Sequence, residues 1–370
     1  MLPGVRVPQW AVATEEAGQF GELLAQVWGL PKVELHLHLE GTLRPETVCD
    51  LARRHDPDSP FCDGEWHRGY WTFCDLSGFV IEFGRVLSTC VRTTDDYYRL
   101  AREAFDDLAA QQVVYAEVSV GPRVPGRPYY VPAGETLAAI DQARREVEAR
   151  TALRAGIIVG LSRNHLIAHD LGPESLALHY VREALRAREA GANVVGIDLH
   201  GDEQGWPQVT PFVSAFRLAG EAGLGLRAHA GEGGGPEVVW DSLRQLGVQR
   251  IAHGVRAVED PALVRHLAQT QVALDLCPTS NVLTGAAPSL PAHPARALDA
   301  AGVAITISSD DPVAFNTSVT TDLALLAHHL GFSVADLGRL SVQAAQHAFL
   351  PEVARTVLAD AVHGAWSGET

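Results

Sequence analysis

Lysine is almost absent from this chain of 370 residues. Lys32 is the only lysine, so the 29 basic residues are one lysine and 28 arginines. This scarcity excludes a phosphate-binding loop of the G-K-[ST] type, which needs its lysine. It also leaves no spare lysine to hold a pyridoxal cofactor as a Schiff base. Chemistry that depends on a lysine amine is therefore not expected.

Cysteine is also scarce, and its five copies form no C-x-x-C pair. This argues against a disulfide framework or a thiolate zinc site and favours a reducing compartment, the cytoplasm. No apolar run approaches the length of a membrane span, and the first 20 residues lack the apolar core of a signal peptide. The net charge of −16 argues against binding to a nucleic-acid backbone or an anionic membrane. We expect a soluble protein with a small-molecule partner; its oligomeric state is left open.

Short β-branched segments alternate with longer amphipathic segments from residue 30 onward. The intervening segments, such as "PESLALHYVREALRAREAG", carry apolar residues at helical spacing. Eight segments are predicted to be strands: Val33–His38, Val113–Val118, Gly156–Gly160, Asn193–Leu199, Gly225–His229, Arg250–His253, Val272–Leu276 and Ala304–Ser308. Strands and helices that alternate in this way predict an α/β fold, a parallel (β/α)8 TIM barrel.

A doubly wound open sheet is the alternative arrangement, but the G-x-G-x-x-G turn that would favour it does not follow the first strand. We predict a single domain over residues 1–370, with an N-terminal helix outside the barrel within residues 1–30. The segment 56–92 is rich in Trp, Phe and Cys and breaks the alternation. It is predicted to be a helical insertion over the barrel mouth that acts as a lid.

The first predicted strand carries two histidines. In "PKVELHLHLEGT", His36 and His38 lie two residues apart, so both side chains point to the same face of the strand. In a barrel this face is the interior, near the strand end at which barrel enzymes build their active sites. One histidine there is more often a core residue with a hydrogen-bond partner. Two buried imidazoles on one face need partners or a shared metal.

Polar side chains also end three later strands. The stretch "LRAHAGEGGG" places His229 at the end of the fifth strand, with Glu232 three residues on. The stretch "RIAHGV" places His253 at the end of the sixth, and "ITISSDDP" places Asp310 and Asp311 at the end of the eighth. Taken alone, two aspartates before a proline are more typical of a turn or a helix cap. Because all these residues end strands, the sequence predicts one common site.

These residue types suit a divalent metal. Zinc accepts neutral imidazole and carboxylate ligands, and three histidines with one aspartate leave room for a water whose pKa the metal lowers. Glu232 can then act as a proton shuttle, and His253 can orient or deprotonate the attacking water. A metal pair bridged by a carboxylated lysine is excluded, because Lys32 precedes the first two histidines and the chain has no other lysine. We predict one zinc ion per chain.

Six short motifs, from residue 31 to residue 312, resemble the adenosine deaminase branch of the amidohydrolase superfamily. They occur in the family's order: "PKVELHLHLEG", "VVGIDLHGDE", "HAGE", "RIAHG", "LCPTSN" and "SSDDP". No H-x-E of this sequence is followed by a P-C-x-x-C, the combination that marks cytidine and tRNA-editing deaminases. The resemblance implies zinc-dependent hydrolysis of a 6-aminopurine at C6, with release of ammonia and a 6-oxopurine as product.

The resemblance also implies roles for individual residues. The zinc ligands would be His36, His38, His229 and Asp310. The catalytic residues would be Glu232, His253 and Asp310. Glu232 would protonate purine N1 while hydroxide attacks C6, and His253 would help to activate and place the water.

The residues that bind the substrate would be His38, Glu40, Gly201 and Asp311. Asp311 would hydrogen-bond purine N7, and the backbone N–H of Gly201 would meet N3. Glu40 aligns with an acidic residue that in some members touches the ribose 5′-hydroxyl.

Three features depart from the pattern of adenosine deaminases. His200 stands where a small residue is common, the second strand ends in "AEVSVGPR" where an arginine-containing "EVRxxP" is more usual, and the segment 56–92 is unusually aromatic. All three are expected to border the pocket, so they bear on the substrate and not on the reaction. Adenosine is the default substrate. The alternatives are adenine and 6-amino-6-deoxyfutalosine, an intermediate of one menaquinone route.

Two other classes of function fit the residues less well. A metal hydrolase acting on a lactone or an amide would not need Glu232, Gly201 and Asp311 together, since these positions read a purine. A non-catalytic binding or signalling protein would be expected to have a broken ligand set, and none of the ligands is missing. Cys277 is expected to be a core residue.

Overall fold

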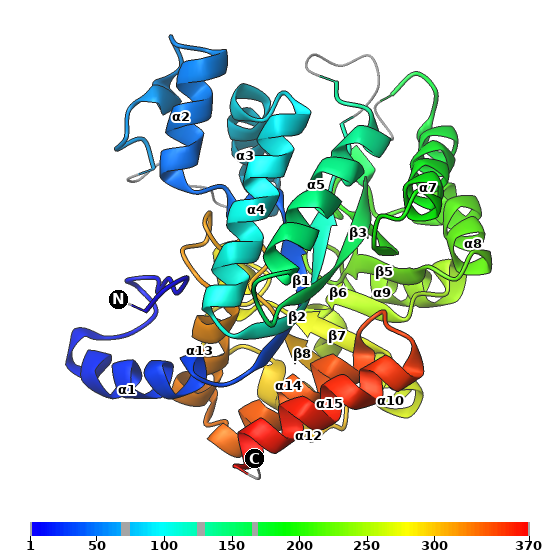
Figure 1. Ribbon diagram of the computed structural model, residues 1–370. Helices are drawn as coiled ribbons and strands as arrows, with labels where there is room; N and C mark the ends of the chain where they lie inside the picture. Colours follow the sequence, from blue (N-terminus) through cyan, green and yellow to red (C-terminus); the bar gives the residue numbers. More distant parts are fainter. Residues whose placement is uncertain (1, 68–74, 124–129, 165–168, 369–370) are drawn as a thin grey trace.

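The computed structural model describes residues 2–67, 75–123, 130–164 and 169–368 (Figure 1). Eight parallel strands form one sheet in which each strand pairs with the next along the chain. Each strand ends within two residues of its prediction. Their bounds are β1 Lys32–His38, β2 Val113–Val120, β3 Arg154–Ser162, β4 Val194–His200, β5 Gly225–Ala230, β6 Arg250–His253, β7 Ala273–Leu276 and β8 Ile305–Ile307.

The sheet closes on itself between the first and last strands. Leu37 and Asp310 form an isolated parallel bridge. The backbone N–H of His38 donates to the Asp310 carbonyl over 2.9 Å, and the Asp310 N–H donates to the His36 carbonyl over 3.0 Å. The predicted (β/α)8 barrel is thereby confirmed and the open sheet is excluded. The seam runs through the backbone of three of the residues predicted to bind metal.

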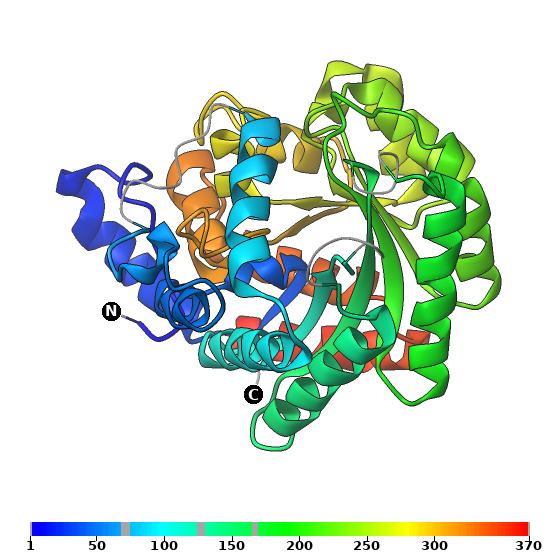
Figure 2. The same ribbon diagram turned by 90° about the horizontal axis from the view of Figure 1, so that it is seen from above.

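Helices surround the ring of strands (Figures 1 and 2). The strands are almost wholly buried, as expected of parallel strands that helices cover. Two helices begin with reciprocal capping boxes, formed by Thr93 with Asp96 and by Ser333 with Asp336. The described α-helices are α1 Ala17–Trp28, α2 Pro45–His55, α3 Leu76–Cys90, α4 Thr94–Ala110, α5 Ala133–Glu148, α7 Pro173–Glu189, α8 Val213–Glu221, α9 Pro236–Asp241, α10 Pro261–Thr270, α11 Pro278–Leu283, α12 Ala295–Ala300, α13 Val319–Leu330, α14 Val334–His347 and α15 Glu352–Ser367.

Two helical segments lie outside the regular alternation. The N-terminal α1 packs through Phe20 and Leu24 against Leu325 of α13, outside the barrel as predicted. Within 56–92, the structure describes a short turn of 3-10 helix, Pro60–Cys62, and α3. Helix α3 crosses the carboxyl end of the barrel (Figure 2). Residues 68–74 of the predicted lid lie outside the described residues, and the lid role itself stays a prediction.

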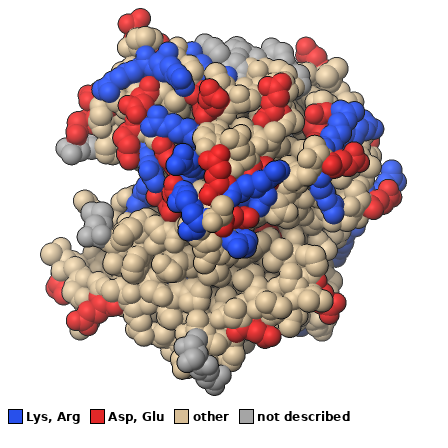
Figure 3. All heavy atoms as spheres, viewed as in Figure 1, with Lys and Arg blue, Asp and Glu red and all other residues tan. Residues whose placement is uncertain are grey.

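Charged side chains are spread unevenly over the face seen in Figure 3. They gather over α2, α4 and α5, whereas the lower half of this face carries few of them. Basic and acidic groups are paired there, as in the ion pair of Arg44 with Asp107 at 2.7 Å and that of Arg99 with Glu103 at 2.9 Å. Within the described residues, no helix is both long enough and apolar enough to cross a membrane.

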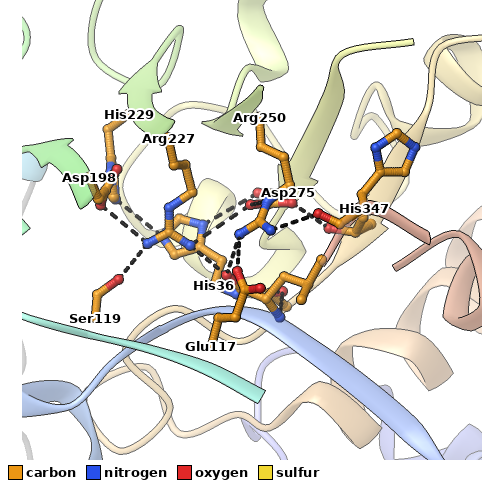
Figure 4. Close-up of polar contacts among 12 residues, drawn as sticks. His36, Glu117, Ser119, Asp198, Arg227, His229, Arg250, Asp275 and His347 are labelled. Carbon is orange, nitrogen blue, oxygen red and sulfur yellow. Dashed lines mark hydrogen bonds and ion pairs between the residues drawn. The ribbon is translucent and has the colours of Figure 1, made fainter. Parts of the chain in front are cut away.

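Two buried arginines occupy the barrel interior beneath the mouth (Figure 4). Arg227 of β5 donates to Asp198 Oδ2 over 3.2 Å. Arg250 of β6 donates to Asp275 Oδ2 over 3.0 Å and to Glu117 Oε2 over 2.6 Å. Buried charges are costly unless they are paired and hydrogen-bonded, and here each guanidinium has a carboxylate partner. A paired polar layer therefore supports the strand ends from below.

The single lysine is used in the scaffold. Lys32 Nζ donates to the carbonyl oxygens of Val27, Trp28 and Leu30 over 2.8, 3.1 and 2.5 Å. Burial lowers its pKa to about 7. It lies at the start of β1, at the end of the strand opposite to His38, which agrees with a site that contains no bridging lysine.

Candidate active site

A cavity opens at the carboxyl ends of the strands and encloses about 1020 Å³ of empty space, its open mouth included. Eight of the nine predicted site residues line it, and His36 lies buried beneath them. One wall is apolar and belongs to α3: Leu76, Phe79, Val80, Phe83 and Leu87. Parallel-barrel enzymes place their sites at this end, so the cavity is the candidate active site.

Four of the predicted residues bring their donor atoms to one point. His229 Nε2 lies 3.1 Å from His36 Nε2 and 3.2 Å from His38 Nε2. Asp310 Oδ1 lies 3.3 Å from His36 Nε2 and 3.4 Å from His38 Nε2. Imidazole nitrogens that face one another this closely need a cation or a proton between them. The four donors come from β1, β5 and the end of β8, strands far apart in the sequence.

The Nδ1 atoms of His229 and His36, on the side of each ring away from the other donors, also have polar partners (Figure 4). His229 Nδ1 lies 3.0 Å from Asp198 Oδ2, and His36 Nδ1 lies 3.5 Å from the Asp275 carbonyl oxygen. These acceptors place the ring protons on Nδ1 and leave Nε2 available to a metal. Burial lowers the pKa of His36 and of His38, which favours the neutral rings that metals require. The donor set therefore fits one divalent ion, which when bound would supply Lewis acidity and a water of lowered pKa.

Asp310 has an unusual backbone. Its φ of +63° lies in the left-handed region, which residues other than glycine seldom adopt. The two hydrogen bonds of the β1–β8 seam hold this conformation. Its side chain points toward the histidines, and Oδ2 accepts from Ser280 Oγ over 2.7 Å. Backbone strain of this kind clusters at functional sites, and here it aims a carboxylate at the predicted metal position.

Glu232 and His253 face each other beside this cluster. His253 Nε2 lies 3.4 Å from Glu232 Oε2 and 3.9 Å from Asp310 Oδ2. Burial, together with the negative charge of Asp310, raises the pKa of Glu232 well above its usual value. Thr284 Oγ1 donates to the other carboxyl oxygen over 3.0 Å. The shift favours the protonated carboxyl that a proton donor needs.

An asparagine fixes the tautomer of His253. Asn281 Oδ1 accepts from the backbone N–H of Cys277 over 3.3 Å and lies 3.1 Å from His293 Nε2. The amide nitrogen of Asn281 must then be the atom that lies 3.0 Å from His253 Nδ1, to which it donates. Burial lowers the pKa of His253, so its single ring proton lies on Nε2. His253 can thus hold an oxygen atom by donating to it, which favours placing the water over deprotonating it.

Asp311 and Glu40 line the opposite part of the cavity. Burial and the charges of Asp310 and Glu40 raise the pKa of Asp311. Its Oδ1 has no hydrogen-bond partner among the described residues. A Cβ at Gly41 would lie only 2.0 Å from this oxygen, so glycine is required for the close approach. Burial raises the pKa of Glu40 to about 7, and its Oε1 accepts from the Gly121 N–H over 2.9 Å.

His200 ends β4, Gly201 follows it, and both line the cavity. Gly201 has a φ of +105°, and a Cβ there would lie 2.4 Å from Asn164 Oδ1. The His200 ring lies 5.5 Å from the ring of His38 and takes space left by Gly160, where a Cβ would lie 2.7 Å from Nε2 of His200. Gly121 and Pro122 of "AEVSVGPR" line the cavity as well. All three departures noted in the sequence therefore border the cavity.

Sequence reasoning missed the residues that support the site. Asp198 lies two residues before His200 on β4 and contacts His229. Ser280 and Asn281, in the stretch "LCPTSN", were assigned no role from the sequence. Cys277 is buried as expected, but its Sγ also lies 3.4 Å from His36 Nδ1. The strand period could have placed Asp198 on the inner face. The partners of the "LCPTSN" residues depend on tertiary packing.

Comparisons with known proteins agree with this geometry. The sequence profile described as adenosine deaminase matches residues 31–365. An adenine deaminase from Rhizobium leguminosarum bv. trifolii is 37% identical over 330 residues, which cover 89% of this chain and 98% of the relative. An aminodeoxyfutalosine deaminase from Streptomyces avermitilis is 36% identical over 359 residues, which cover 96% and 98%.

Solved structures give the same result. The crystal structure of an adenine deaminase from Arthrobacter aurescens superposes with a TM-score of 0.81 at 30% identity, covering 90% of this chain and 98% of the other. An amidohydrolase from Burkholderia ambifaria with bound zinc superposes with a TM-score of 0.83 at 26% identity, covering 100% and 97%. The shared profile, the extent of the alignments and the confirmed barrel lead to one conclusion: this chain belongs to the adenosine deaminase family of metal-dependent amidohydrolases and is a hydrolytic deaminase.

Proposed function

We propose that this enzyme hydrolyses the 6-amino group of a purine nucleoside, with zinc as its metal and adenosine as the simplest substrate. The observation that carries the proposal is that two buried carboxyl groups, Glu232 and Asp311, line the cavity together with the candidate metal ligands, and that burial raises the pKa of both. Protonated carboxyls can donate hydrogen bonds, and a purine presents two ring nitrogens, N1 and N7, on either side of C6. The relatives named as deaminases of adenine and aminodeoxyfutalosine support a 6-aminopurine.

Each residue then has a definite task in the reaction. Glu232 donates its proton to N1, which makes C6 electrophilic. His253 holds the attacking oxygen through its Nε2 proton, and Asp311 donates to N7. The Gly201 N–H meets N3. His36, His38, His229 and Asp310 would hold the zinc ion, whose nature is supported by the zinc-bound relative. When water adds at C6, Glu232 recovers a proton from it. The second proton of the water passes to the C6 amino group, which leaves as ammonia and gives the 6-oxopurine.

The residues that line the outer part of the cavity favour a nucleoside over a free base. The cavity extends from the metal ligands to Phe83 and Leu87 of α3 and to Tyr180 of α7. A bare adenine would leave the outer part empty. The apolar outer wall also makes the substituted nucleoside 6-amino-6-deoxyfutalosine a second candidate.

Ammonia release from a matched panel tests the proposal. Purified enzyme loaded with one equivalent of zinc is assayed with adenosine, 2′-deoxyadenosine, adenine and 6-amino-6-deoxyfutalosine, and kcat/KM is compared. We expect one of the nucleosides to exceed adenine by at least about 10-fold, because filling the outer cavity adds binding energy of more than about 1.4 kcal/mol. A value for adenine equal to or above all nucleosides would refute nucleoside specificity, and no ammonia from any of the four would refute the proposed reaction.

Helix α3 is proposed to act as the lid over the bound substrate. Phe79 is buried against Phe315, with ring centroids 4.8 Å apart, and lines the cavity. Replacing Phe79 with alanine should raise KM about 10-fold and change kcat less, because the loss of apolar contact costs on the order of 1–2 kcal/mol of binding. Ile81→Ala is the matched control, since Ile81 lies on the same helix and is 67% exposed. Equal KM values for the two variants would argue against the lid.

A further inference from the structure

A second glutamate holds the loop that carries Glu232. Glu203 follows β4, is wholly buried, and is not among the described residues that line the cavity. Its Oε2 accepts from the backbone N–H of Gly231 over 2.9 Å and from that of Gly234 over 3.0 Å. These two N–H groups flank Glu232 in the sequence. One carboxylate oxygen therefore fixes the backbone on both sides of the proposed proton donor.

The glycines of this loop allow the carboxylate to approach. A Cβ at Gly234 would lie 2.8 Å from Glu203 Oε2 and 2.6 Å from a methyl group of Val238. Gly231 has a φ of +74°, and a Cβ there would lie 2.7 Å from Val239 Cγ2. Larger residues at these two positions would push the backbone away from Glu203. The glycines of the "GEGGG" stretch thus leave the space in which the Glu203 carboxylate reaches the backbone N–H groups of Gly231 and Gly234.

The start of the same loop is held by a buried arginine. Arg163 Nη2 donates to the backbone carbonyl of His229 over 2.9 Å, and Nη1 donates to the carbonyl of Trp206 over 3.3 Å. Arg163 is as deeply buried as Glu203 and has the opposite charge. Two buried side chains thus hold the loop from His229 to Gly234, Arg163 at its start and Glu203 around Glu232.

We propose that Glu203 is a positioning residue for Glu232, and that it acts through the acceptor geometry of its carboxyl oxygen. The inference rests on the proposed function, in which Glu232 passes a proton to the substrate. Proton transfer requires the donor within hydrogen-bonding distance, and a displacement of about 1 Å can cost about 100-fold in rate. Releasing the two N–H groups would let the loop, and Glu232 with it, move by such an amount.

Two substitutions separate the effect of the length of the Glu203 side chain from the effect of its charge. Glu203→Gln keeps the length of the side chain and one oxygen that can accept both N–H groups. The amide nitrogen replaces Oε1, which has no hydrogen-bond partner among the described residues. Glu203→Asp keeps the charge but is one methylene shorter. We expect kcat of the Gln variant within about 3-fold of the wild type and kcat of the Asp variant lowered about 100-fold with KM changed less.

Two further measurements do not depend on turnover. Hydrogen exchange of the Gly231 and Gly234 amides should be faster in Glu203→Asp than in the wild type and unchanged in Glu203→Gln. Bound zinc, measured by atomic absorption, should remain one per chain in both variants, because no metal ligand is altered. If Glu203→Asp does not fold, Gly234→Ala replaces it, because a Cβ there would lie 2.8 Å from Glu203 Oε2 and should displace the Gly234 N–H from that oxygen. Its kcat should then fall, and a normal kcat would overturn the proposal.

The result that would overturn the proposal is a Gln variant as slow as Glu232→Gln, or an Asp variant with normal kcat and normal exchange. A slow Gln variant would assign the effect to charge. Glu232→Gln is measured in parallel, so that the role of Glu232 as proton donor and the role of Glu203 as its positioning residue are tested separately. If Glu232→Gln retains turnover, the proposed function of Glu232 fails; if it loses turnover while Glu203→Asp stays fully active, the role of Glu203 alone fails.

Discussion

Replacing Glu232 with glutamine should lower kcat about 1000-fold while the fold and the bound metal are retained. General acid catalysis typically contributes about 10²- to 10⁴-fold, and Glu232 has the raised pKa that this role needs because it is buried next to Asp310. Glutamine keeps the shape and can accept the hydrogen bond from Thr284, but it has no carboxyl proton to give. Steady-state kinetics measure kcat of the variant, atomic absorption measures its zinc content, and thermal unfolding shows whether its fold is retained.

Thr284→Val provides the matched control for this prediction. It removes the hydroxyl that donates to Glu232 over 3.0 Å but leaves the carboxyl in place. Its kcat should fall by less than about 10-fold, since one neutral hydrogen bond is worth about 1 kcal/mol. A Glu232→Gln variant with a near-normal rate, or one no slower than Thr284→Val, would contradict the role of Glu232 as proton donor.

Removing the metal should abolish activity and lower the melting temperature. Three imidazoles and one carboxylate meet with donor separations of 3.1 to 3.4 Å, and without a cation the nitrogen lone pairs face one another. An ion present at about 1,000 times its dissociation constant stabilises the native state by about 4 kcal/mol. Dialysis against a chelator should therefore leave below about 1% of the activity, and one equivalent of zinc should restore both activity and melting temperature.

Two histidine variants test whether this effect belongs to the proposed site. His38→Ala should bind zinc at least about 10-fold more weakly than the wild type. His266→Ala should bind zinc normally, because His266 of α10 packs against Trp240 of α9, outside the cavity, with ring centroids 4.9 Å apart. Full activity of the chelated protein, with no metal by atomic absorption, would contradict a metal-dependent reaction in this chain.

Most of the scaffold could be predicted because its signals are local. Short β-branched segments such as "VVGIDLH" can only be strands once helical segments of regular length separate them. Histidines at alternate positions of β1 must share a face. The side chains of His36 and His38 were therefore expected to lie near the residues at the carboxyl ends of the other strands. The position of the site follows from the barrel itself, since the carboxyl ends of all eight strands converge.

The remainder depends on contacts between distant segments. No periodicity shows that the amide of Asn281 sets the tautomer of His253, or that Asp198 orients His229. The packing of Phe79 on Phe315 brings together α3 and the loop after β8, which are separated by most of the barrel. The left-handed backbone of Asp310 is imposed by pairing with β1. These features become visible only when the whole chain is folded.

The seam between β1 and β8 sets the order in which the enzyme can mature. Leu35 and Ser308, which hydrogen-bond across it, are 273 residues apart, and such non-local pairings form late because loop closure is costly. During synthesis, a nascent chain that ends before β8 has both β1 histidines but no strand to close against, and it also lacks the carboxylate of Asp310. Truncated products should therefore be inert, and activity should appear in one step when the last strand joins the first.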